Sequence, residues 1–260
     1  ISSGKGGVGK STVTATLAVL LADSGYTGGV LDADVGGFSM PQLLGIDSEI
    51  RGQRAGEGKT VMKPITKQIG DGALNVVSMG SIAGTNETEA IMWRGLMLNR
   101  AVQHFLEDVQ WGELDYLLID MPPGTSDIQM GLARMLPRTD VLIVTTPAKA
   151  AQLGAARAAD MARKGYLRVA GVIENMGPST NPDGTVTAMF GSGGGERLAE
   201  SIGVPLLASI PLDTAVAAAG DDGTPAALEH PDSAASVAYR DLAEIIITDV
   251  APPIEIAECS

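Results

Sequence analysis

The sequence has 260 residues and a formal net charge of −13, and hydrophobic residues make up 45% of it. These values fit one sizeable globular domain, while the acidic balance argues against non-specific binding to nucleic acid or to anionic membranes. The single cysteine excludes a disulfide framework within the chain, and no apolar run reaches transmembrane length, so we expect a cytoplasmic protein with neither nucleic-acid nor membrane partners.

Six apolar runs are typical of buried parallel strands, and they occupy residues 29–34, 74–79, 115–120, 140–146, 169–175 and 205–210. Helical spacing of apolar residues separates several of these runs, in the segments 11–24, 96–108 and 152–164. In the first of these segments the residues that share one face are Val13, Leu17, Leu20 and Leu21. Strands that alternate with helices predict an α/β fold, a doubly wound and mostly parallel sheet with helices on both faces.

Three segments lack these patterns. Residues 51–69 are polar and mixed in charge, which predicts a surface excursion, and residues 177–195 are rich in loop formers, with a short hairpin expected around Asp183 and Gly184. The tail from about residue 251 contains two prolines and is expected to be irregular. Because the first glycines follow residue 1 almost directly, we expect a first strand that is cut short and a natural polypeptide that extends further at its N-terminus.

A glycine-rich loop with the pattern G-x-x-x-x-G-K-[ST] occupies residues 4–11, directly before the first predicted helix. Its backbone N–H groups can wrap around a phosphate, Lys10 brings positive charge to the β- and γ-phosphates, and the Ser11 hydroxyl can ligate Mg²⁺. The alternative is a glycine-rich turn that only caps a helix. We expect ATP and Mg²⁺ as cofactors of one P-loop ATPase domain over residues 1–260. The expected nucleotide-binding residues in this loop are Gly4, Gly6, Gly7, Val8, Gly9, Lys10, Ser11 and Thr12.

Carboxylates follow two of the predicted strands. Asp32 and Asp34 are two residues apart, so in a strand they point the same way, and buried like charges at that spacing predict a magnesium site. For Asp32 a helix cap or turn cap is the alternative. Asp120 ends the hydrophobic run 116–119 in the Walker B form and is expected to hold Mg²⁺ through water. The turn 121–125 that follows is suited to sensing a γ-phosphate.

Two strand ends carry candidates for recognition of the base. Asn175 closes one apolar run, where its amide can pair with the adenine edge. Pro211 and Asp213 follow the last run and could pack on the ring and bond it. Both positions are equally compatible with ordinary strand-end turns.

The sequence resembles the Mrp, or ApbC-type, family in a series of motifs that runs, in chain order, SGKGGVGKST, LDADVGGFSMPQLLG, LIDMPPGTSDIQ, VTTP, GVIENM, FGSGGG and IPLD. The resemblance covers residues 2 to about 244. It implies a cytoplasmic homodimeric ATPase that carries or assembles iron–sulfur clusters, with iron–sulfur proteins as clients.

The loop also contains a second lysine, Lys5, in a form similar to the deviant Walker A motif of the MinD/ParA group. That resemblance implies a catalytic Lys5 that reaches the phosphates bound by the partner subunit, much as an arginine finger does. It further implies that Asp34 is catalytic and orients or activates the attacking water, while Asp32 serves the magnesium shell.

One departure from the family pattern concerns the cluster. Many members carry a C-x-x-C pair between the ENM and FGxGGG motifs, but residues 177–184 here read GPSTNPDG. Thiolates hold such clusters, and the only thiol in this sequence is Cys259. Oxygen ligands from Asn181 or Asp183 would be weak. The ATPase interpretation is unaffected by this loss, whereas an iron–sulfur cluster bound to this chain becomes doubtful.

Other functions remain open at this stage. A MinD- or ParA-like positioning or partition switch would need a basic amphipathic tail or a basic surface, and residues 252–258 are acidic and broken by prolines. A small-molecule kinase or synthetase would need a second substrate site, and ADP release without an added acceptor separates it from a self-contained ATPase.

Overall fold

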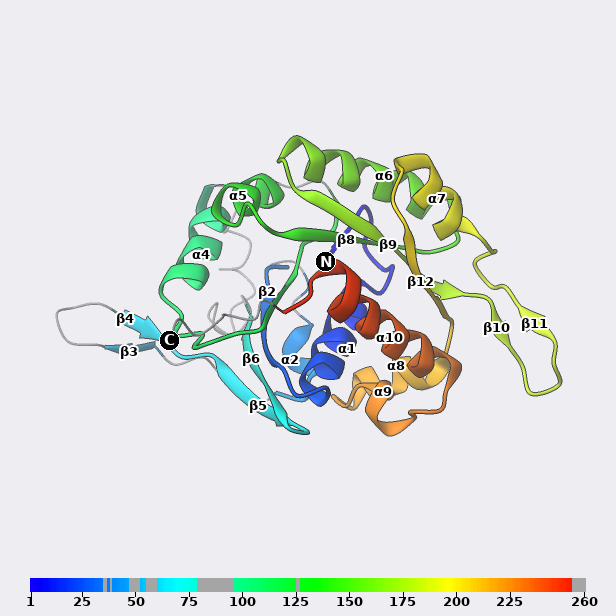
Figure 1. The fold of residues 1–260 in the computed structure, drawn as a ribbon, viewed down its shortest axis with the longest axis horizontal. Coiled ribbons are helices and arrows are strands. Elements are labelled where there is room, and N and C mark those ends of the chain that lie inside the picture. The colour runs from blue at the N-terminus through cyan, green and yellow to red at the C-terminus, as the bar shows by residue number, and fades with distance from the viewer. Residues whose placement is uncertain are drawn as a thin grey trace, which may run out of the picture.

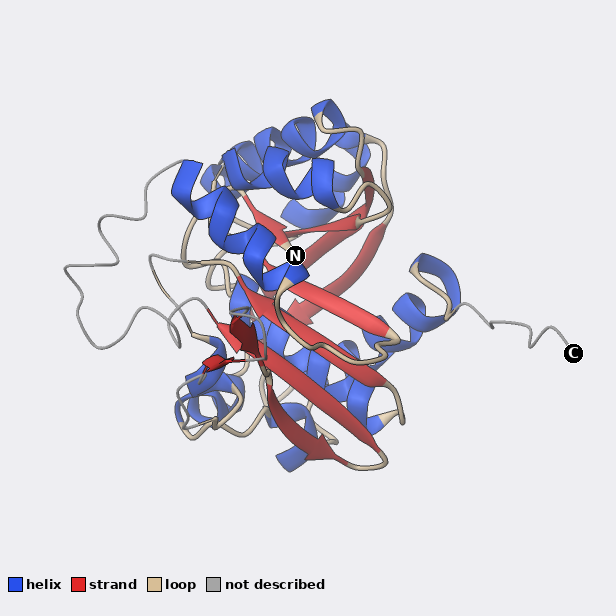
Figure 2. Cartoon of the chain, turned by 90° about the vertical axis from the view of Figure 1, so that its left-hand side faces the viewer, coloured by secondary structure: helices blue, strands red, loops and turns tan. Residues whose placement is uncertain are grey.

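A central β-sheet lies between two layers of helices (Figure 1, Figure 2). The structure is a computed structural model, and it describes residues 1–34, 37, 39–46, 52–54, 60–78, 96–124 and 127–253. The strands are β1 (Ser2–Ser3), β2 (Thr27–Asp32), β3 (Gly52–Arg54), β4 (Thr60–Met62), β5 (Ile65–Ile69), β6 (Gly72–Ser78), β7 (Tyr116–Asp120), β8 (Asp140–Thr145), β9 (Arg168–Gly177), β10 (Ser179–Thr180), β11 (Val186–Thr187) and β12 (Leu206–Pro211).

The helices follow the strands in the alternating order that the sequence predicts. They are α1 (Lys10–Asp23), α2 (Met40–Leu43), α4 (Leu96–Glu107), α5 (Asp127–Met135), α6 (Lys149–Lys164), α7 (Gly194–Ile202), α8 (Thr214–Asp221), α9 (Ala226–Glu229) and α10 (Ala234–Ile245), which continues into the π-helix η3 (Ile246–Val250). Within the described ranges, no helix is long and apolar enough to cross a membrane.

Two four-stranded sheets form the centre, in the orders β5-β6-β2-β7 and β1-β8-β9-β12. They meet where the N–H of Met121 donates to the carbonyl of Ile1 at 3.1 Å and the N–H of Gly124 donates to the carbonyl of Ser3 at 2.9 Å. Every pairing within these sheets is parallel except that of β5 with β6. The predicted doubly wound, mostly parallel α/β fold is confirmed, and its parallel strands bring β1, β2 and β7 side by side with their carboxyl ends at one edge.

Helix α1 differs from its prediction as an amphipathic helix. Its residues are buried almost all round from Val13 to Ala22. The sheet covers one side, and α10 packs on the other. Because the sequence of α10 is more than two hundred residues away, the local pattern of α1 could not reveal that both sides would be covered. Helices α4 to α7 cover the opposite face of the sheet, where a second apolar cluster contains Val102, Phe105 and Leu132.

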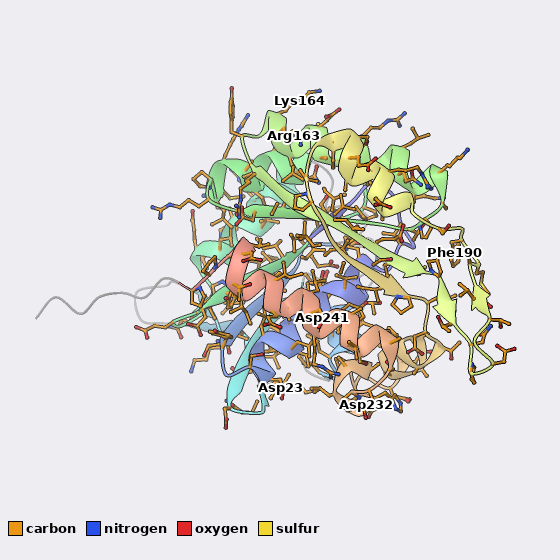
Figure 3. The ribbon with its side chains drawn as sticks, turned by 45° about the vertical axis from the view of Figure 1, so that its right-hand side comes forward. Asp23, Arg163, Lys164, Phe190, Asp232 and Asp241 are labelled. Carbon is orange, nitrogen blue, oxygen red and sulfur yellow. The ribbon has the colours of Figure 1, made fainter. Side chains whose placement is uncertain are left out.

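The prediction that residues 51–69 form a surface excursion is partly wrong. Residues 65–69 form β5, which extends the central sheet as an antiparallel strand, and residues 52–54 pair with 60–62 as a two-stranded ladder. The short antiparallel hairpin predicted around Asp183 is confirmed: β10 pairs with β11, and Gly184 has a φ of 82°. This hairpin projects from the body of the molecule, with Phe190 beside it (Figure 1, Figure 3).

Candidate nucleotide-binding site

The P-loop leaves β1 and turns into α1 at the carboxyl edge of the sheet. Gly7 and Gly9 have φ values of 77° and 81°, in the left-handed region that side chains disfavour. Gly4 lies against α6 so closely that a Cβ there would come within 1.7 Å of the Gly154 carbonyl carbon. The glycines at these positions are therefore needed for the course of the loop.

A buried polar cluster lies directly beneath the loop and centres on Asp120. The ammonium of Lys10 contacts its Oδ2 at 2.7 Å, and the Ser11 hydroxyl donates to the same oxygen at 2.6 Å. Thr14 donates to Oδ1 at 2.8 Å from one helical turn further along α1. The Asp120 side chain is fully buried, so these charge-assisted contacts act in a medium of low dielectric. The structure thus brings together three residues that the sequence singled out, Lys10, Ser11 and Asp120.

Thr14 is a member of this cluster that the sequence interpretation missed. Its spacing of four residues from Lys10 was an available signal, because residues at i and i+4 share one helix face. Its hydroxyl oxygen is also 3.0 Å from the Lys10 carbonyl oxygen, so its one hydrogen is shared between the helix backbone and the carboxylate.

Asp32 and Asp34 lie in different surroundings. An oxygen of Asp34 is 3.9 Å from the Lys10 nitrogen, and its side chain is 14% exposed. Asp32 is fully buried and accepts hydrogen bonds from the N–H of Met40 at 3.3 Å and the hydroxyl of Ser78 at 3.1 Å. Since Met40 is the first residue of α2, the alternative interpretation of Asp32 as a structural acceptor at a helix start has direct support. Its role toward magnesium stays a prediction.

Burial, followed by the nearby charge of Asp120, raises the pKa of Asp32 from 3.8 to about 7. Because the folded pKa exceeds the unfolded one, the folded chain binds this proton more tightly. The resulting stabilisation is present below about pH 4 and is lost as the pH rises toward 7.

We expect Asp32→Asn to flatten the pH dependence of stability. In buffer with EDTA and without nucleotide, the free energy of unfolding of the original protein should fall by no more than about 4 kcal/mol between pH 4 and pH 7, as roughly 1.4 kcal/mol per pKa unit implies. The Asn side chain cannot ionise, so the free energy of unfolding of this variant should fall much less over the same pH range. Urea unfolding at several pH values would measure it. Asp183→Asn is the control, because hydrogen bonds from Thr185 lower the pKa of that exposed carboxyl and place its titration below this window. Equal slopes for the Asp32→Asn variant and the original protein would contradict the raised pKa.

A cavity of about 340 Å³ opens beside the start of α1, and the predicted base-recognition residues line it. Asn175, Pro211 and Asp213 meet Gly9 and Thr12 of the loop there. Asn175 is buried, and its amide donates to the Val8 carbonyl at 3.0 Å, so its hydrogen bond goes to the loop in this structure. Asp213 caps α8 by accepting from the N–H of Ala215 at 2.9 Å.

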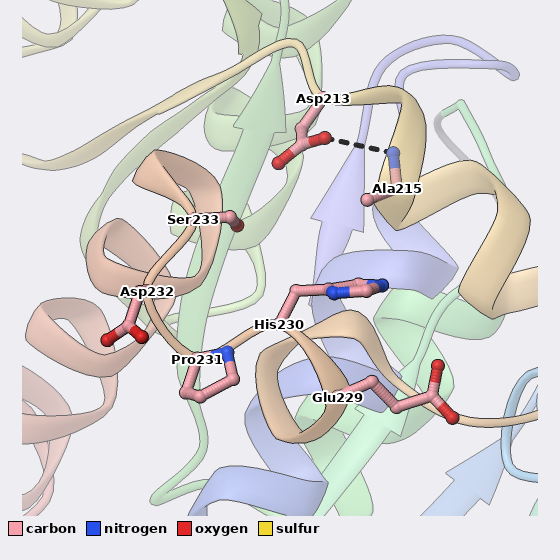
Figure 4. Close-up of a pocket in the computed structure, with 7 residues that line it drawn as sticks. All are labelled: Asp213, Ala215, Glu229, His230, Pro231, Asp232 and Ser233. Carbon is pink, nitrogen blue, oxygen red and sulfur yellow. Dashed lines mark hydrogen bonds between the residues drawn. The ribbon is translucent and has the colours of Figure 1, made fainter.

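A second hollow, of about 450 Å³, shares Asp213 with the first and is lined by Glu229, His230, Asp232 and Ser233 (Figure 4). It contains none of the P-loop residues. The hollow of about 340 Å³ is therefore the one that can receive the remainder of a nucleotide whose phosphates lie in the loop.

Glu174 is a buried carboxylate within β9 that the sequence interpretation did not use. It accepts from the N–H of Gly195 at 2.6 Å and from the hydroxyl of Ser209 at 2.8 Å. A Cβ on Gly195 would come within 2.5 Å of the Glu174 Cβ. This contact explains the glycine at position 195, in the first turn of α7. The hydrogen bonds of Glu174 form a junction that holds α7 and β12 against β9.

The β10–β11 hairpin lies at the position where many family members carry a C-x-x-C pair. Its polar side chains form hydrogen bonds within the hairpin. Asp183 accepts from the N–H and the hydroxyl of Thr185 at 2.9 and 2.6 Å, and Asn181 donates to that hydroxyl at 2.9 Å. In the part of the chain that the structure describes, no group of three or more His, Cys, Asp and Glu side chains is arranged to hold a metal ion. Cys259 and Thr125 lie outside the described residues.

Solved structures with the same arrangement include nucleotide-bound proteins. A nucleotide-binding protein from Archaeoglobus fulgidus in complex with ADP superposes with a TM-score of 0.71 at 33% identity, over 90% of this chain and 87% of that one. The septum site-determining protein MinD of Pyrococcus horikoshii, complexed with Mg-ADP, gives 0.70 at 24% identity, over 97% and 96%. The second comparison supports the fold alone.

Sequence relatives define the family. The iron-sulfur cluster carrier protein of Mycobacterium tuberculosis is 44% identical over 254 residues, which are 95% of this chain and 64% of that protein. The chain thus spans less than two thirds of the length of this relative. The iron-sulfur cluster carrier protein of Saccharolobus solfataricus is 41% identical over 249 residues, 95% of this chain and 81% of the relative. A family model described as ParA, NUBPL iron-transfer P-loop NTPase matches residues 1–247. The family resemblance read from the motifs is confirmed: the chain belongs to this family of iron-transfer P-loop NTPases.

Proposed function

We propose that the protein is a magnesium-dependent, homodimeric ATPase that acts in the carriage or assembly of iron–sulfur clusters. The observation that carries the ATPase part is the convergence of Lys10, Ser11 and Thr14 on the buried Asp120 beneath the P-loop. A cation, a hydroxyl and a carboxylate within 3.3 Å of one another, at a loop shaped by glycines, are the groups that phosphate binding requires.

Lys10 is held by carboxylates until phosphate arrives. Its ammonium lies 2.7 Å from Asp120 and 3.9 Å from Asp34. An incoming triphosphate brings more negative charge than one carboxylate and draws Lys10 toward the β- and γ-phosphates. The movement frees Asp120 from its ion pair at the moment when the phosphates have bound.

The oxygen donors at this place suit magnesium, a hard cation that prefers oxygen ligands. The Ser11 hydroxyl and the Asp120 carboxylate are 2.6 Å apart, and with Asp34 and Asp32 they are the residues that would hold the ion. Bound there, magnesium would neutralise charge on the phosphate oxygens.

Hydrolysis requires a positioned water and a way to offset the charge that develops on the phosphoryl group. Asp34, at the rim of the cluster and partly exposed, is our candidate for orienting that water. Lys5 is exposed and takes no part in the cluster around Asp120 within its own subunit. We infer that it acts on nucleotide bound by the second copy, when two copies close face to face.

Cluster carriage is tested by anaerobic reconstitution with iron and sulfide, with bound iron per dimer and visible absorbance as readouts. If this chain itself carries the cluster, the original protein retains iron and Cys259→Ala loses it, because Cys259 is the only thiol in the sequence. Absence of iron from both proteins would contradict carriage by this chain and leave the ATPase proposal standing, with the cluster held by a client.

A further inference from the structure

Two hydroxyl groups at the cavity beside the P-loop lack hydrogen-bond partners. Among the described residues, buried side-chain atoms without a partner occur in Ser39, Tyr116, Gln129 and Tyr239. Two of these four, Ser39 and Tyr239, line the cavity that holds Asn175 and Asp213. Buried polar atoms without partners are uncommon in folded proteins, so two at one cavity call for an explanation.

Tyr239 comes from α10, which packs on both α1 and β12. The side chain is 1% exposed and belongs to the main apolar cluster. Burial raises the pKa of its hydroxyl, and nearby Thr16 opposes that rise only in part. No hydrogen bond of acceptable geometry joins the two side chains. A phenylalanine would fill the same space without burying a hydroxyl that lacks a partner of good hydrogen-bond geometry.

Ser39 also lines the cavity and comes directly before α2. It occupies the N-cap position of that helix, yet its side chain makes no cap hydrogen bond. Its hydroxyl is therefore not engaged in the role that serine commonly has at a helix start.

The position of the cavity limits what can pair with these groups. Gly9 and Thr12 are among its lining residues, and they belong to the P-loop and to the start of α1, where the phosphates of a nucleotide would bind. The rest of the space, including Ser39 and Tyr239, then receives the nucleoside. A nucleoside offers ring nitrogens, an exocyclic group and ribose hydroxyls, and a hydroxyl side chain can donate to some of these and accept from others.

We propose that Tyr239 hydrogen-bonds the nucleoside part of the bound nucleotide, with Ser39 as a second contact, so that α10 takes part in recognising the ligand. This inference rests on the proposed nucleotide-binding function. It adds Tyr239, which none of the sequence motifs contains, and it gives a role to Ser39, which lies within the motif of residues 31–45.

The test compares binding of ADP with binding of pyrophosphate, which has the phosphates but no nucleoside, by isothermal titration calorimetry in magnesium buffer. We expect Tyr239→Phe to weaken ADP binding about fivefold, the loss of one hydrogen bond that the ligand had satisfied, and to leave pyrophosphate binding unchanged. Ser39→Ala should show the same selectivity. The melting temperature of the ligand-free Tyr239→Phe variant should equal or exceed that of the original protein.

Tyr116→Phe is the matched control. Its hydroxyl is likewise buried and unpaired, but it lies on β7 outside the cavity, so both affinities should stay as in the original protein. An equal loss of ADP and pyrophosphate binding in Tyr239→Phe, or no loss of either, would overturn the role of Tyr239 while the proposed function stands. If the original protein bound neither ADP nor pyrophosphate, the proposed function would be overturned together with this inference.

Discussion

Lys10→Ala is expected to lower ATP hydrolysis by at least about a hundredfold and to weaken nucleotide binding, since Lys10 is the cation of the P-loop. The substitution has a second consequence. Lys10 and Asp120 form a buried ion pair at 2.7 Å, and removal of one partner leaves an uncompensated charge that costs about 3–5 kcal/mol. Loss of activity in this variant alone could therefore reflect unfolding.

The double variant Lys10→Ala with Asp120→Asn separates the two effects. It removes the unpaired carboxylate while an amide oxygen remains to accept from Ser11 or Thr14. We expect the thermal unfolding temperature to return toward that of the original protein, whereas ADP binding, measured by calorimetry, stays weakened. Full ATP turnover in a well-folded Lys10→Ala variant would refute the assignment of the loop.

Asp34→Ala is expected to leave nucleotide binding within about threefold of the original and to slow hydrolysis by about a hundredfold, the usual contribution of a group that positions or activates a nucleophile. Binding should persist because Asp34 is only a distant partner of Lys10, at 3.9 Å, while Asp120 provides the close contact. Calorimetry with ADP and single-turnover hydrolysis of ATP measure the two quantities separately.

Asp34→Asn is the matched control, because it keeps the shape and removes the charge. It should slow hydrolysis nearly as much as Asp34→Ala if the carboxylate activates water. Loss of ADP binding in either variant would show that Asp34 serves ligand binding and not the chemical step.

Local motifs predicted most of the fold and the phosphate end of the site. The P-loop and the strand-end carboxylates of β2 and β7 are read from short stretches of sequence, and the parallel sheet then brings Lys10 and Asp120 together across more than a hundred residues. Strand β5 was missed because its residues alternate in burial at the sheet edge and have no apolar run.

The remaining parts depend on contacts between distant segments. The full burial of α1 comes from α10, and Glu174 acquires its role only when α7 and β12 meet β9. Asn175 lies within β9, two residues before the end of the strand, and its partner in this structure is a loop carbonyl that no local pattern identifies. Tyr239 belongs to no motif, and only the cavity relates it to the P-loop.

The most direct measurement is phosphate release from ATP by the purified protein, with magnesium and with EDTA, and without any added acceptor. An ATPase of the proposed kind releases phosphate and ADP in equal amounts with magnesium, and EDTA abolishes the release. Nucleotide binding without any magnesium-dependent phosphate release, or release that requires an added acceptor, would contradict the proposed activity.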